Sequence, residues 1–545
     1  MKFCVILRNV INKYDIMKMN RTLLLASFAL AMATSLFAQS PKAALLPMPN
    51  EVTILEHEKP FPIAKNGISV YAADATLGFA AQTLVEILTE TFGTQAVMAD
   101  RAKGADVVLT LDDALIGKEH YALSVGRKGI TIKGATPTAV FYGVQTLHQV
   151  VMGDERSTLN GEVAALNIDD APRYGFRALM LDPARHFLPL NDVKFFIDQM
   201  VRYKYNVLQL HLTDDQGWRI AIESQPKLAS KQHYTKQQLR ELVDYAAQRG
   251  VEVIPEIDVP GHTVAILAAY PELACQHLQD SKMEVGTTTN RMLCASQAQV
   301  YSIMADVVRE VAETFQSPYF HLGGDEAAVP ENWAKCEKCQ ALMHQHGYTK
   351  PTQLMIPFFE NVLRNVRRAG KKPILWCELN NIWPPADDYL FPYPKDVTLV
   401  TWRNALTPTC LELTKKNGHP IIMAPGEHAY LDYPQYKNDF PEFNNWGMPI
   451  TTLEKCYELD PGYGMEAASV DHVMGVMGTL WAEAIPDVNR ATYMAYPRAL
   501  ALAEAGWTNM EHRSWEDFKQ RMFPNVYHLM KQGVSVRVPF EVVKR

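Results

Sequence analysis

The chain reads Tyr319-Phe320-His321-Leu322-Gly323-Gly324-Asp325-Glu326 in its second half, and this stretch decides both the fold and the chemistry that we predict. Its first four residues are typical of a short buried strand, and the glycine pair lets the backbone bend sharply where the strand ends. Successive strand residues point to opposite faces, so Asp325 and Glu326 can lie in different environments. One carboxyl can then stay ionised while the other is kept protonated as a general acid. The alternative is a solvated helix start with Asp325 as its N-cap, and only the rest of the chain separates the two readings.

Short apolar segments that end in polar or small residues recur between residues 173 and 508, and several are followed by a helical stretch. The eight predicted strands are Phe176–Leu181, Val207–Leu212, Val251–Ile257, Tyr319–Leu322, Pro373–Trp376, Val397–Thr401, Pro420–Met423 and Met474–Leu480. Helices are predicted between them at Asn191–Tyr203, Thr235–Gln248, Gln297–Phe315 and Gln353–Arg368. This alternation predicts an α/β fold, a closed (β/α)8 TIM barrel, with its site at the carboxyl ends of the strands.

A different pattern precedes the predicted barrel, and a short tail follows it. Residues 39–172 predict a small α+β domain without a constellation of reactive groups, and Pro172 marks its end. Residues 509–545 predict a helical tail that is too small to be a separate binding module. The predicted elements of these two regions are helices at Leu77–Phe92, Thr136–Met152 and Trp515–Lys531 and strands at Asp106–Leu111 and Gly129–Lys133.

Residues 1–38 have the pattern of a secretory signal peptide. Lys18 and Arg21 precede the apolar segment Leu23–Phe37, and Ala38 is the expected cleavage point. The apolar segment is shorter than the ~20 residues that a membrane-spanning helix needs. We therefore expect an exported protein, periplasmic or secreted, without a membrane span.

The composition is that of a globular protein with a mild acidic excess. The formal net charge is -7, and no long basic run is present, which argues against a nucleic-acid binder because phosphate contacts need clustered Lys and Arg. Nine Trp are enough to build surfaces on which sugar rings stack.

Eight cysteines are present, and Cys4 would be removed with the leader, which leaves an odd number. An odd count excludes a fully paired disulfide framework, and a chain of 545 residues is too large to depend on one. The only close pair is Cys336 and Cys339, which by itself is weak evidence for zinc and is about as compatible with a local disulfide. Cys275 and Cys294 flank a loop and are another candidate pair.

The reactive side chains of the predicted barrel follow its strands. They are Asp182, Arg185 and His186 after the first, Asp214 after the second, Asp258 and His262 after the third, Asp325 and Glu326 after the fourth, Trp376 and Trp402 near the ends of the fifth and sixth, Tyr430 and Asp432 after the seventh, and Trp481 and Glu483 after the eighth. Any one has an ordinary structural explanation, such as core packing for Trp376 or turn chemistry at Asp258. Structural roles alone are much less able to explain reactive residues at eight strand ends on one barrel face, and this pattern favours an active site.

This set of side chains favours glycoside hydrolysis. It contains carboxylates, aromatic rings and one arginine, without a Ser-His-Asp order, a phosphate loop or a metal-type histidine cluster. Trp rings cover the apolar faces of sugars, carboxylates accept hydrogen bonds from hydroxyls, and Arg donates them. An ordinary glycosidase needs two carboxyl groups apart across the scissile bond, whereas Asp325 and Glu326 are adjacent. Their adjacency favours the exception in which the 2-acetamido group of the substrate is the nucleophile.

Five motifs occur in order along the chain, and with them it resembles glycoside hydrolase family 20, the β-N-acetylhexosaminidases, over nearly the whole length after the leader. The motifs are Leu181-Asp182-Pro183-Ala184-Arg185-His186-Phe187, His211-Leu212-Thr213-Asp214-Asp215-Gln216-Gly217-Trp218-Arg219, Pro255-Glu256-Ile257-Asp258-Val259-Pro260-Gly261-His262, His321-Leu322-Gly323-Gly324-Asp325-Glu326 and Trp481-Ala482-Glu483. The resemblance implies an exo-acting enzyme that releases terminal β-linked GlcNAc or GalNAc from glycans such as glycoproteins or chitooligosaccharides. It implies no cofactor and no metal.

The resemblance also implies a role for each residue. Glu326 protonates the departing glycosidic oxygen, Asp325 holds the acetamido N–H, and Tyr430 hydrogen-bonds the acetamido carbonyl oxygen, which attacks the anomeric carbon to form an oxazolinium ion. The remaining implied roles are walls of the acetamido pocket for Trp376, Trp402 and Trp481, contact with the O3/O4 edge of the sugar for Arg185, contact with its O4/O6 side for Asp432 and Glu483, and polar support behind the acid for Asp214, Asp258 and His262.

Two expectations concern the acid and its surroundings. Glu326 has to be protonated near neutral pH, so we expect burial and the nearby Asp325 charge to raise its pKa. The stretch Trp376-Cys377-Glu378 departs from the family pattern, in which an acidic or amide residue more often follows the Trp. The alternatives are a disaccharide-releasing enzyme of the same fold and a glycan-binding protein that has lost catalysis.

Overall fold

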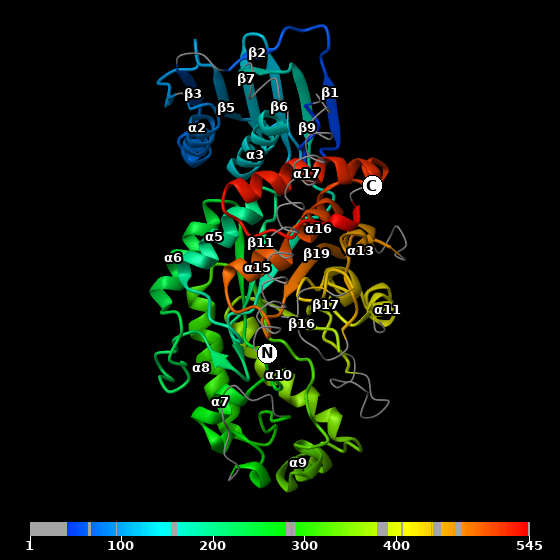
Figure 1. Cartoon of the computed structure of the whole chain (residues 1–545). Helices are drawn as coiled ribbons and strands as arrows, with labels where there is room; N and C mark the ends of the chain where they lie inside the picture. Colours follow the sequence, from blue (N-terminus) through cyan, green and yellow to red (C-terminus); the bar gives the residue numbers. More distant parts are fainter. Residues whose placement is uncertain are drawn as a thin grey trace, which may run out of the picture.

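The computed structural model describes residues 41–63, 67–93, 95–153, 161–279, 285, 290–378, 391–404, 407–437, 439, 448–463 and 470–542. The predicted leader lies outside these residues. Eight parallel strands close into a barrel, which confirms the predicted fold (Figure 1). In order around the barrel they are β10 (Phe176–Leu181), β11 (Val207–His211), β14 (Glu252–Glu256), β15 (Tyr319–His321), β16 (Lys372–Trp376), β17 (Thr398–Thr401), β18 (Ile421–Met423) and β19 (Val473–Leu480).

The barrel strands are apolar on both faces because each face is covered. Every residue of β10 is buried, as is every residue of β11, β17 and β18. Parallel sheets have this property when helices pack on the outside and side chains fill the inside. The first and last strands close the barrel through a six-residue register that runs from Phe176 opposite Gly475 to Leu181 opposite Leu480.

Helices between the strands pack their apolar sides on the barrel. They include α5 (Leu190–Val201), α6 (Lys236–Ala247), α8 (Ala298–Thr314), α10 (Met355–Arg368) and α11 (Thr407–Asn417). The start of α6 shows how the sequence fixes such a helix. Thr235 accepts a hydrogen bond from the N–H of Gln238, and the Gln238 side chain accepts one from the N–H of Thr235, so two unpaired donors are satisfied together.

The N-terminal region forms the predicted α+β domain. Its seven-stranded sheet has the order β1-β9-β6-β7-β5-β3-β4, and helices α2 (Gly78–Phe92) and α3 (Pro137–Gly153) pack on it. The strands are β1 (Glu51–Ile54), β3 (Ile68–Ala72), β4 (Ala96–Met98), β5 (Val107–Leu111), β6 (Tyr121–Gly126), β7 (Gly129–Gly134) and β9 (Leu166–Asp170). The stretch from Ala139 to Val151 of α3 is buried all round, because this helix lies between the sheet and the rest of the molecule (Figure 1).

The C-terminal helix α17 (Trp515–Lys531) lies between the N-terminal domain and the barrel (Figure 1). Arg521 of this helix forms two hydrogen bonds with buried Glu504, at 2.8 and 2.9 Å, and a third with the carbonyl oxygen of Leu45 at 2.7 Å. Glu504 also accepts a hydrogen bond from the N–H of Met48 at 3.1 Å. The tail is thus an integral part of the fold, since one buried ion pair joins three regions that are far apart in sequence.

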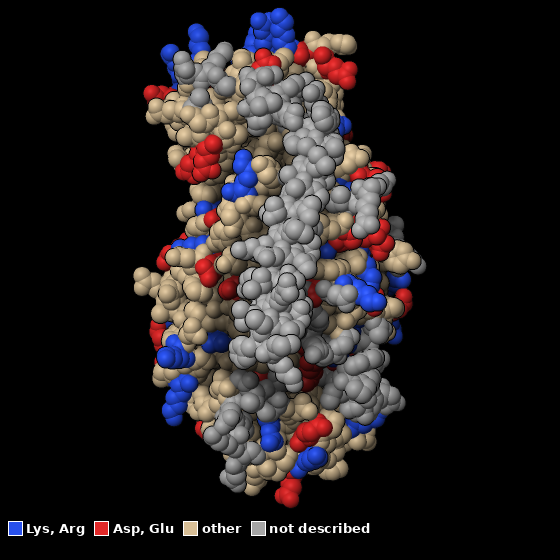
Figure 2. Space-filling model, viewed as in Figure 1, with Lys and Arg blue, Asp and Glu red and all other residues tan. Residues whose placement is uncertain are grey.

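The surface of the described chain matches its composition. Acidic and basic side chains are interspersed over the face in Figure 2, where no large patch of one sign is seen. Among the residues that the structure describes, no helix has the length and apolar character needed to cross a bilayer.

We predict that Glu504→Ala lowers the free energy of unfolding by about 3 kcal/mol, the lower end for a broken buried ion pair, because the buried Arg521 guanidinium keeps only the partly exposed Asp517 as an ionic partner among the described residues. Urea unfolding followed by circular dichroism measures the change. The matched control is Glu412→Ala, since the Glu412 side chain is 71 % exposed and its pair with Lys415 lies at the surface. The control should change stability by less than ~0.5 kcal/mol. Equal effects of both substitutions would contradict the role given to the buried pair.

Candidate active site

A cavity of about 840 Å³ opens at the carboxyl ends of the barrel strands. Its lining includes most of the residues predicted from the sequence: Arg185, Asp214, Asp258, His262, Asp325, Glu326, Trp402, Tyr430, Asp432, Trp481 and Glu483. Residues that are up to 298 positions apart in the chain, from Arg185 to Glu483, therefore meet in one place. This convergence is what the barrel topology predicts for an active site.

The two glycines before the carboxylate pair lie in a tight turn, and Asp258 closely approaches the first of them. A Cβ atom on Gly323 would lie 1.8 Å from Asp258 Oδ1, and both glycines have positive φ, 63° and 101°. The N–H of Gly324 donates a hydrogen bond to Asp258 Oδ1 at 3.1 Å. Only glycine fits at position 323, because any other side chain would collide with the Asp258 carboxyl group, and the positive φ favours glycine at position 324.

The turn after the glycines gives the two carboxyl groups different surroundings, as the sequence predicts. Asp325 is 6 % exposed, whereas the Glu326 side chain is 48 % exposed and reaches into the cavity. Glu326 has φ of +46°, a conformation that L-residues rarely adopt and that is concentrated at functional sites. The strained backbone therefore places Glu326 toward solvent and Asp325 against the protein.

One carboxylate oxygen of Asp325 is buried without a hydrogen-bond partner among the described residues. The same holds for Asp258 Oδ2, Asp432 Oδ1 and the indole N–H of Trp402, which belong to residues that line the cavity. Buried polar atoms are nearly always paired, so unpaired ones that line a cavity indicate groups that bind a polar ligand. Here they offer carboxyl oxygens and an indole donor, which suits a ligand with both N–H or O–H groups and acceptor oxygens.

His262 connects the carboxylate pair to the polar layer beneath it. Its Nε2 lies 3.5 Å from Glu326 Oε2 and 3.8 Å from Asp325 Oδ2, and its Nδ1 lies 3.2 Å from Asp214 Oδ1. Burial lowers the pKa of His262, but the Asp214 carboxylate and the hydrogen bonds around the ring outweigh this and raise it well above 6.5. The imidazole is therefore a largely enclosed cation between Asp214 on one side and the Asp325–Glu326 pair on the other.

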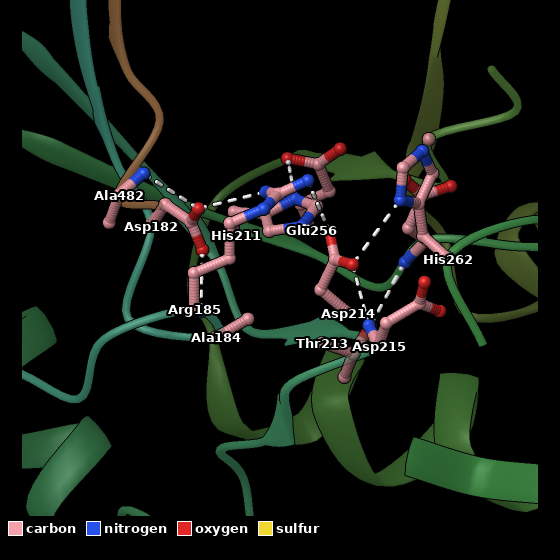
Figure 3. Close-up of polar contacts among 12 residues, drawn as sticks. Asp182, Ala184, Arg185, His211, Thr213, Asp214, Asp215, Glu256, His262 and Ala482 are labelled. Carbon is pink, nitrogen blue, oxygen red and sulfur yellow. Dashed lines mark hydrogen bonds and ion pairs between the residues drawn. The ribbon is translucent and has the colours of Figure 1, made fainter. Parts of the chain in front are cut away.

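A second histidine continues this chain into the barrel interior, as Figure 3 shows. His211 Nε2 lies 2.8 Å from Asp214 Oδ2, and its Nδ1 lies 2.9 Å from Glu256 Oε2. The other oxygen of Glu256 accepts a hydrogen bond from the indole N–H of Trp376 at 2.8 Å. Burial raises the pKa of Glu256, but its histidine neighbours bring it down to about 2, so the carboxylate stays ionised. Carboxylates and histidine cations thus alternate along this series of contacts and hold each imidazole ring in place.

Arg185, which also lines the cavity, is held by three carboxylates. It lies 2.8 Å from Asp182, 3.0 Å from Asp214 and 3.4 Å from Glu483. Its guanidinium carbon is 5.0 Å from the centre of the Trp481 ring. Asp182 also accepts the N–H of Ala482, so it ties the first strand end to the eighth (Figure 3). Arg185 is fixed in place, and its remaining donor capacity faces the cavity that it lines.

Of the aromatic residues predicted to wall the cavity, Trp376 is the one that does not line it. Trp402 and Trp481 line the cavity, as does Tyr430, whose pKa is raised well above 10 by burial, so that it keeps its proton and can donate a hydrogen bond. Trp376 is 1 % exposed and is not among the lining residues that the structure describes. Its ring centre lies 5.7 Å from that of Trp481, so Trp376 supports the wall from behind.

The expected rise in the pKa of Glu326 is wrong for this arrangement. Burial does raise the pKa of Glu326, but the hydrogen bond from His262, the charge of His262 and that of Arg403 outweigh it and hold the pKa at about 2. By contrast, burial raises the pKa of Asp325, with Glu326 adding to the rise and His262 opposing it. The missed factor is a second cation beside the exposed carboxylate.

Arg403 is that cation, and sequence reasoning did not identify it. Its Nη2 lies 2.9 Å from Glu326 Oε1 and 3.3 Å from Glu378 Oε1, and its guanidinium carbon is 3.9 Å from the centre of the Trp402 ring. Glu378 is fully buried, and burial raises its pKa to about 8 although Arg403 lowers it. A basic residue directly after a strand-end Trp was the available signal, since Arg403 follows Trp402.

Comparison with known proteins shows similarity over both domains. Residues 174–510 match the family "Glycosyl hydrolase family 20, catalytic domain", and residues 42–171 match "Glycosyl hydrolase family 20, domain 2". The β-hexosaminidase of Akkermansia muciniphila is 39 % identical over 437 residues, which cover 76 % of this chain and 84 % of that protein.

Solved structures show the same similarity in three dimensions. The N-acetyl-β-hexosaminidase of Streptomyces plicatus in complex with thio-NAglucal has a TM-score of 0.79 and 30 % identity, with 92 % of this chain and 98 % of that one covered. The exo-β-N-acetylglucosaminidase of Vibrio harveyi in complex with N-acetylglucosamine has a TM-score of 0.78 and 28 % identity, with 92 % and 79 % covered.

Proposed function

The chain belongs to glycoside hydrolase family 20, and on this premise we propose that its cavity hydrolyses terminal, non-reducing β-linked N-acetylhexosamine residues by substrate-assisted catalysis. The activity is that of a β-N-acetylhexosaminidase, a glycoside hydrolase. Its substrates are glycans that carry GlcNAc or GalNAc, with glycoproteins and chitooligosaccharides as candidates. The leader pattern of residues 1–38 supports the further proposal that the enzyme is exported to the periplasm or secreted, which N-terminal sequencing of the mature protein checks.

The unpaired carboxylate oxygen of Asp325 carries the proposal. Asp325 Oδ1 is buried beside the exposed Glu326 and lines the cavity with Tyr430. An acetamido N–H supplies the donor that this oxygen lacks, and the Tyr430 hydroxyl supplies a donor for the acetamido carbonyl oxygen. A simple sugar hydroxyl in that position would use Asp325 but would leave Tyr430 without a carbonyl to orient. The pair therefore fits an acetamido group better.

Asp325 and Glu326 then have separate tasks in the reaction. The carbonyl oxygen of the acetamido group attacks the anomeric carbon while Glu326 gives its proton to the departing glycosidic oxygen, so that the C–O bond breaks and an oxazolinium ion forms. The Asp325 carboxylate stabilises the positive charge that develops on that ring. Glu326, now ionised, takes a proton from water, which attacks the same carbon and gives net retention.

Glu326 has to be protonated for the first step, and Arg403 opposes this. The pKa of about 2 depends on charge from His262 and Arg403, so Arg403 must release Glu326 before the proton can be held near neutral pH. Glu378 offers the released guanidinium a second partner, already at 3.3 Å. We propose that a sugar bound next to the Trp402 ring turns Arg403 toward Glu378 and so raises the pKa of Glu326.

Support for the sugar comes from the rest of the cavity. Arg185 faces one edge, and the unpaired Asp432 Oδ1 and the partly exposed Glu483 offer acceptors for hydroxyl groups on another side. Both epimers at O4 can be accommodated by flexible side chains, so we propose that GlcNAc and GalNAc are both released. A glycan-binding protein without catalysis would have no use for a strained Glu326 beside a buried carboxylate.

The central test of the function is Asp325→Ala with β-GlcNAc, β-GalNAc and β-glucose p-nitrophenyl substrates. We expect the variant to lose at least about 10²- to 10³-fold in kcat on the acetamido sugars, because the charge that balances the oxazolinium ion is gone. Azide should not restore activity, since Asp325 is not the nucleophile. The wild type should be almost inert on the β-glucoside, which lacks its own nucleophile. Robust β-glucoside cleavage would contradict the mechanism, and inactivity on both acetamido sugars would favour the glycan-binding alternative.

The acid is tested separately by Glu326→Gln. The variant keeps the size of the side chain but has no proton to give, so we expect a loss of ~10²–10⁴-fold on substrates with poor leaving groups. Activated aryl glycosides should lose less, because their leaving groups depart without protonation. The measurement is the ratio of kcat/KM between the two substrate types. An unchanged ratio would show that Glu326 is not the acid.

The role of Arg403 is tested through the pH profile of kcat/KM, which reports groups of the free enzyme. Removing the cation in Arg403→Met should raise the pKa of Glu326 and move the alkaline limb of the profile to higher pH. Arg403→Lys keeps the charge and is the matched control, expected to leave the limb near its original position. If Arg403→Met changes KM but leaves the alkaline limb where it is, the role of Arg403 is sugar binding through its stack on Trp402.

A further inference from the structure

Four buried cysteines from two separate loops meet outside the proposed active site. Cys275 and Cys294 belong to the segment between β14 and α8, and Cys336 and Cys339 to the segment after β15, at the start of α9 (Glu337–Gln345). Each is at most 1 % exposed. Their four Sγ atoms all lie within 4.8 Å of one another. The sequence identified these residues as two separate candidate pairs, and the fold brings the pairs together.

The spacing of the sulfur atoms is that of a tetrahedral metal site. Cys294 Sγ lies 3.4 Å and Cys275 Sγ 4.0 Å from Cys339 Sγ. Four thiolates around Zn²⁺ at about 2.3 Å lie roughly 3.8 Å apart along each edge of the tetrahedron. Both measured separations are close to that edge, and one sulfur is near two partners at once. Two separate disulfides would instead bring each sulfur close to a single partner.

The surroundings of the sulfurs also suit a structural metal. Cys336 and Cys339 are separated by two residues at the first turn of α9, a ligand spacing that is common in zinc sites. Ser296 lies beside the cluster, with its hydroxyl 3.2 Å from Cys294 Sγ and 3.6 Å from Cys339 Sγ. A hydroxyl in this position donates a hydrogen bond to thiolate sulfur, as outer partners of metal ligands do.

We propose that Cys275, Cys294, Cys336 and Cys339 form a closed Cys4 site that binds one structural Zn²⁺. All four ligands come from protein and all are buried, so the ion has no open position for water or substrate. Cys377, Cys410 and Cys456 are also buried but lie outside this group. The site is distinct from the carboxylate cavity, whose lining contains none of these cysteines.

The ion would hold together the two loops that carry the catalytic groups. The first loop begins with Asp258 and His262, and the second with Asp325 and Glu326. The loops are also joined by hydrogen bonds, from Trp333 Nε1 to the carbonyl of Leu293 at 2.9 Å and from the N–H of Met292 to Asn332 Oδ1 at 3.3 Å. The Cys4 site adds a second connection, so His262 and Glu326 keep their separation.

The test is metal analysis of the full-length protein, purified without chelator. We expect one zinc per chain by inductively coupled plasma mass spectrometry and an X-ray absorption spectrum that shows four sulfur neighbours at about 2.3 Å. Cys339→Ser should lose most of the zinc and lower the melting temperature. Cys410→Ser removes a buried cysteine outside the cluster and is the matched control, expected to keep its zinc.

Two outcomes would overturn the proposal. Zinc content that is the same in Cys339→Ser as in the wild type would place the ion elsewhere. Intact-mass analysis after alkylation that shows two disulfides among the four cysteines, with no zinc, would show that the cluster is oxidised, as an exporting compartment favours. If Cys339→Ser fails to fold, the X-ray absorption spectrum of the wild type still shows whether the zinc has sulfur ligands.

Discussion

The contact between the Asp258 carboxyl group and the glycine pair Gly323-Gly324 is the constraint on which the site depends. It joins the ends of two neighbouring barrel strands and turns the chain so that Asp325 faces inward and Glu326 outward. Burial, together with the nearby Asp325, raises the pKa of Asp258 well above its usual range, so the group can keep its proton so close to another carboxyl group. The strained φ of Glu326 persists because this packed turn leaves it no alternative.

Charge balance is the second requirement, since the cavity gathers many carboxyl groups in one place. Arg185, His211, His262 and Arg403 each contact at least two carboxyl groups, so Asp182, Asp214 and Glu256 each have a cationic partner. Removing one cation would leave a carboxylate buried without a partner, which is costly, or would force it to take up a proton. The polar residues behind the acid therefore set the protonation state of the groups in front of it.

The sequence predicts what depends on local pattern and on barrel topology. The eight strands are found within one residue of their expected ends, and the strand-end residues meet because carboxyl ends of parallel strands share one face. Arg403 with Glu378 and the four-cysteine cluster were not predicted as units. Each depends on the packing of long loops against one another, which the local sequence pattern does not reveal. The wrong expectation for the pKa of Glu326 has the same origin, because the two cations that lower it, His262 and Arg403, come from the loops after other strands.

The low pKa of Glu326 is compatible with an acid whose proton is acquired only when substrate arrives. A carboxylate paired with a mobile cation in the open cavity stays hydrated and charged, whereas the same group beside a bound sugar loses water and one of its partners. Asp325 changes in the opposite sense, since the oxazolinium ion gives it the positive neighbour that favours its charged form. Two adjacent carboxyl groups can thus change their charge states in opposite directions during the reaction, because one faces solvent and the other is buried under the turn that Asp258 fixes.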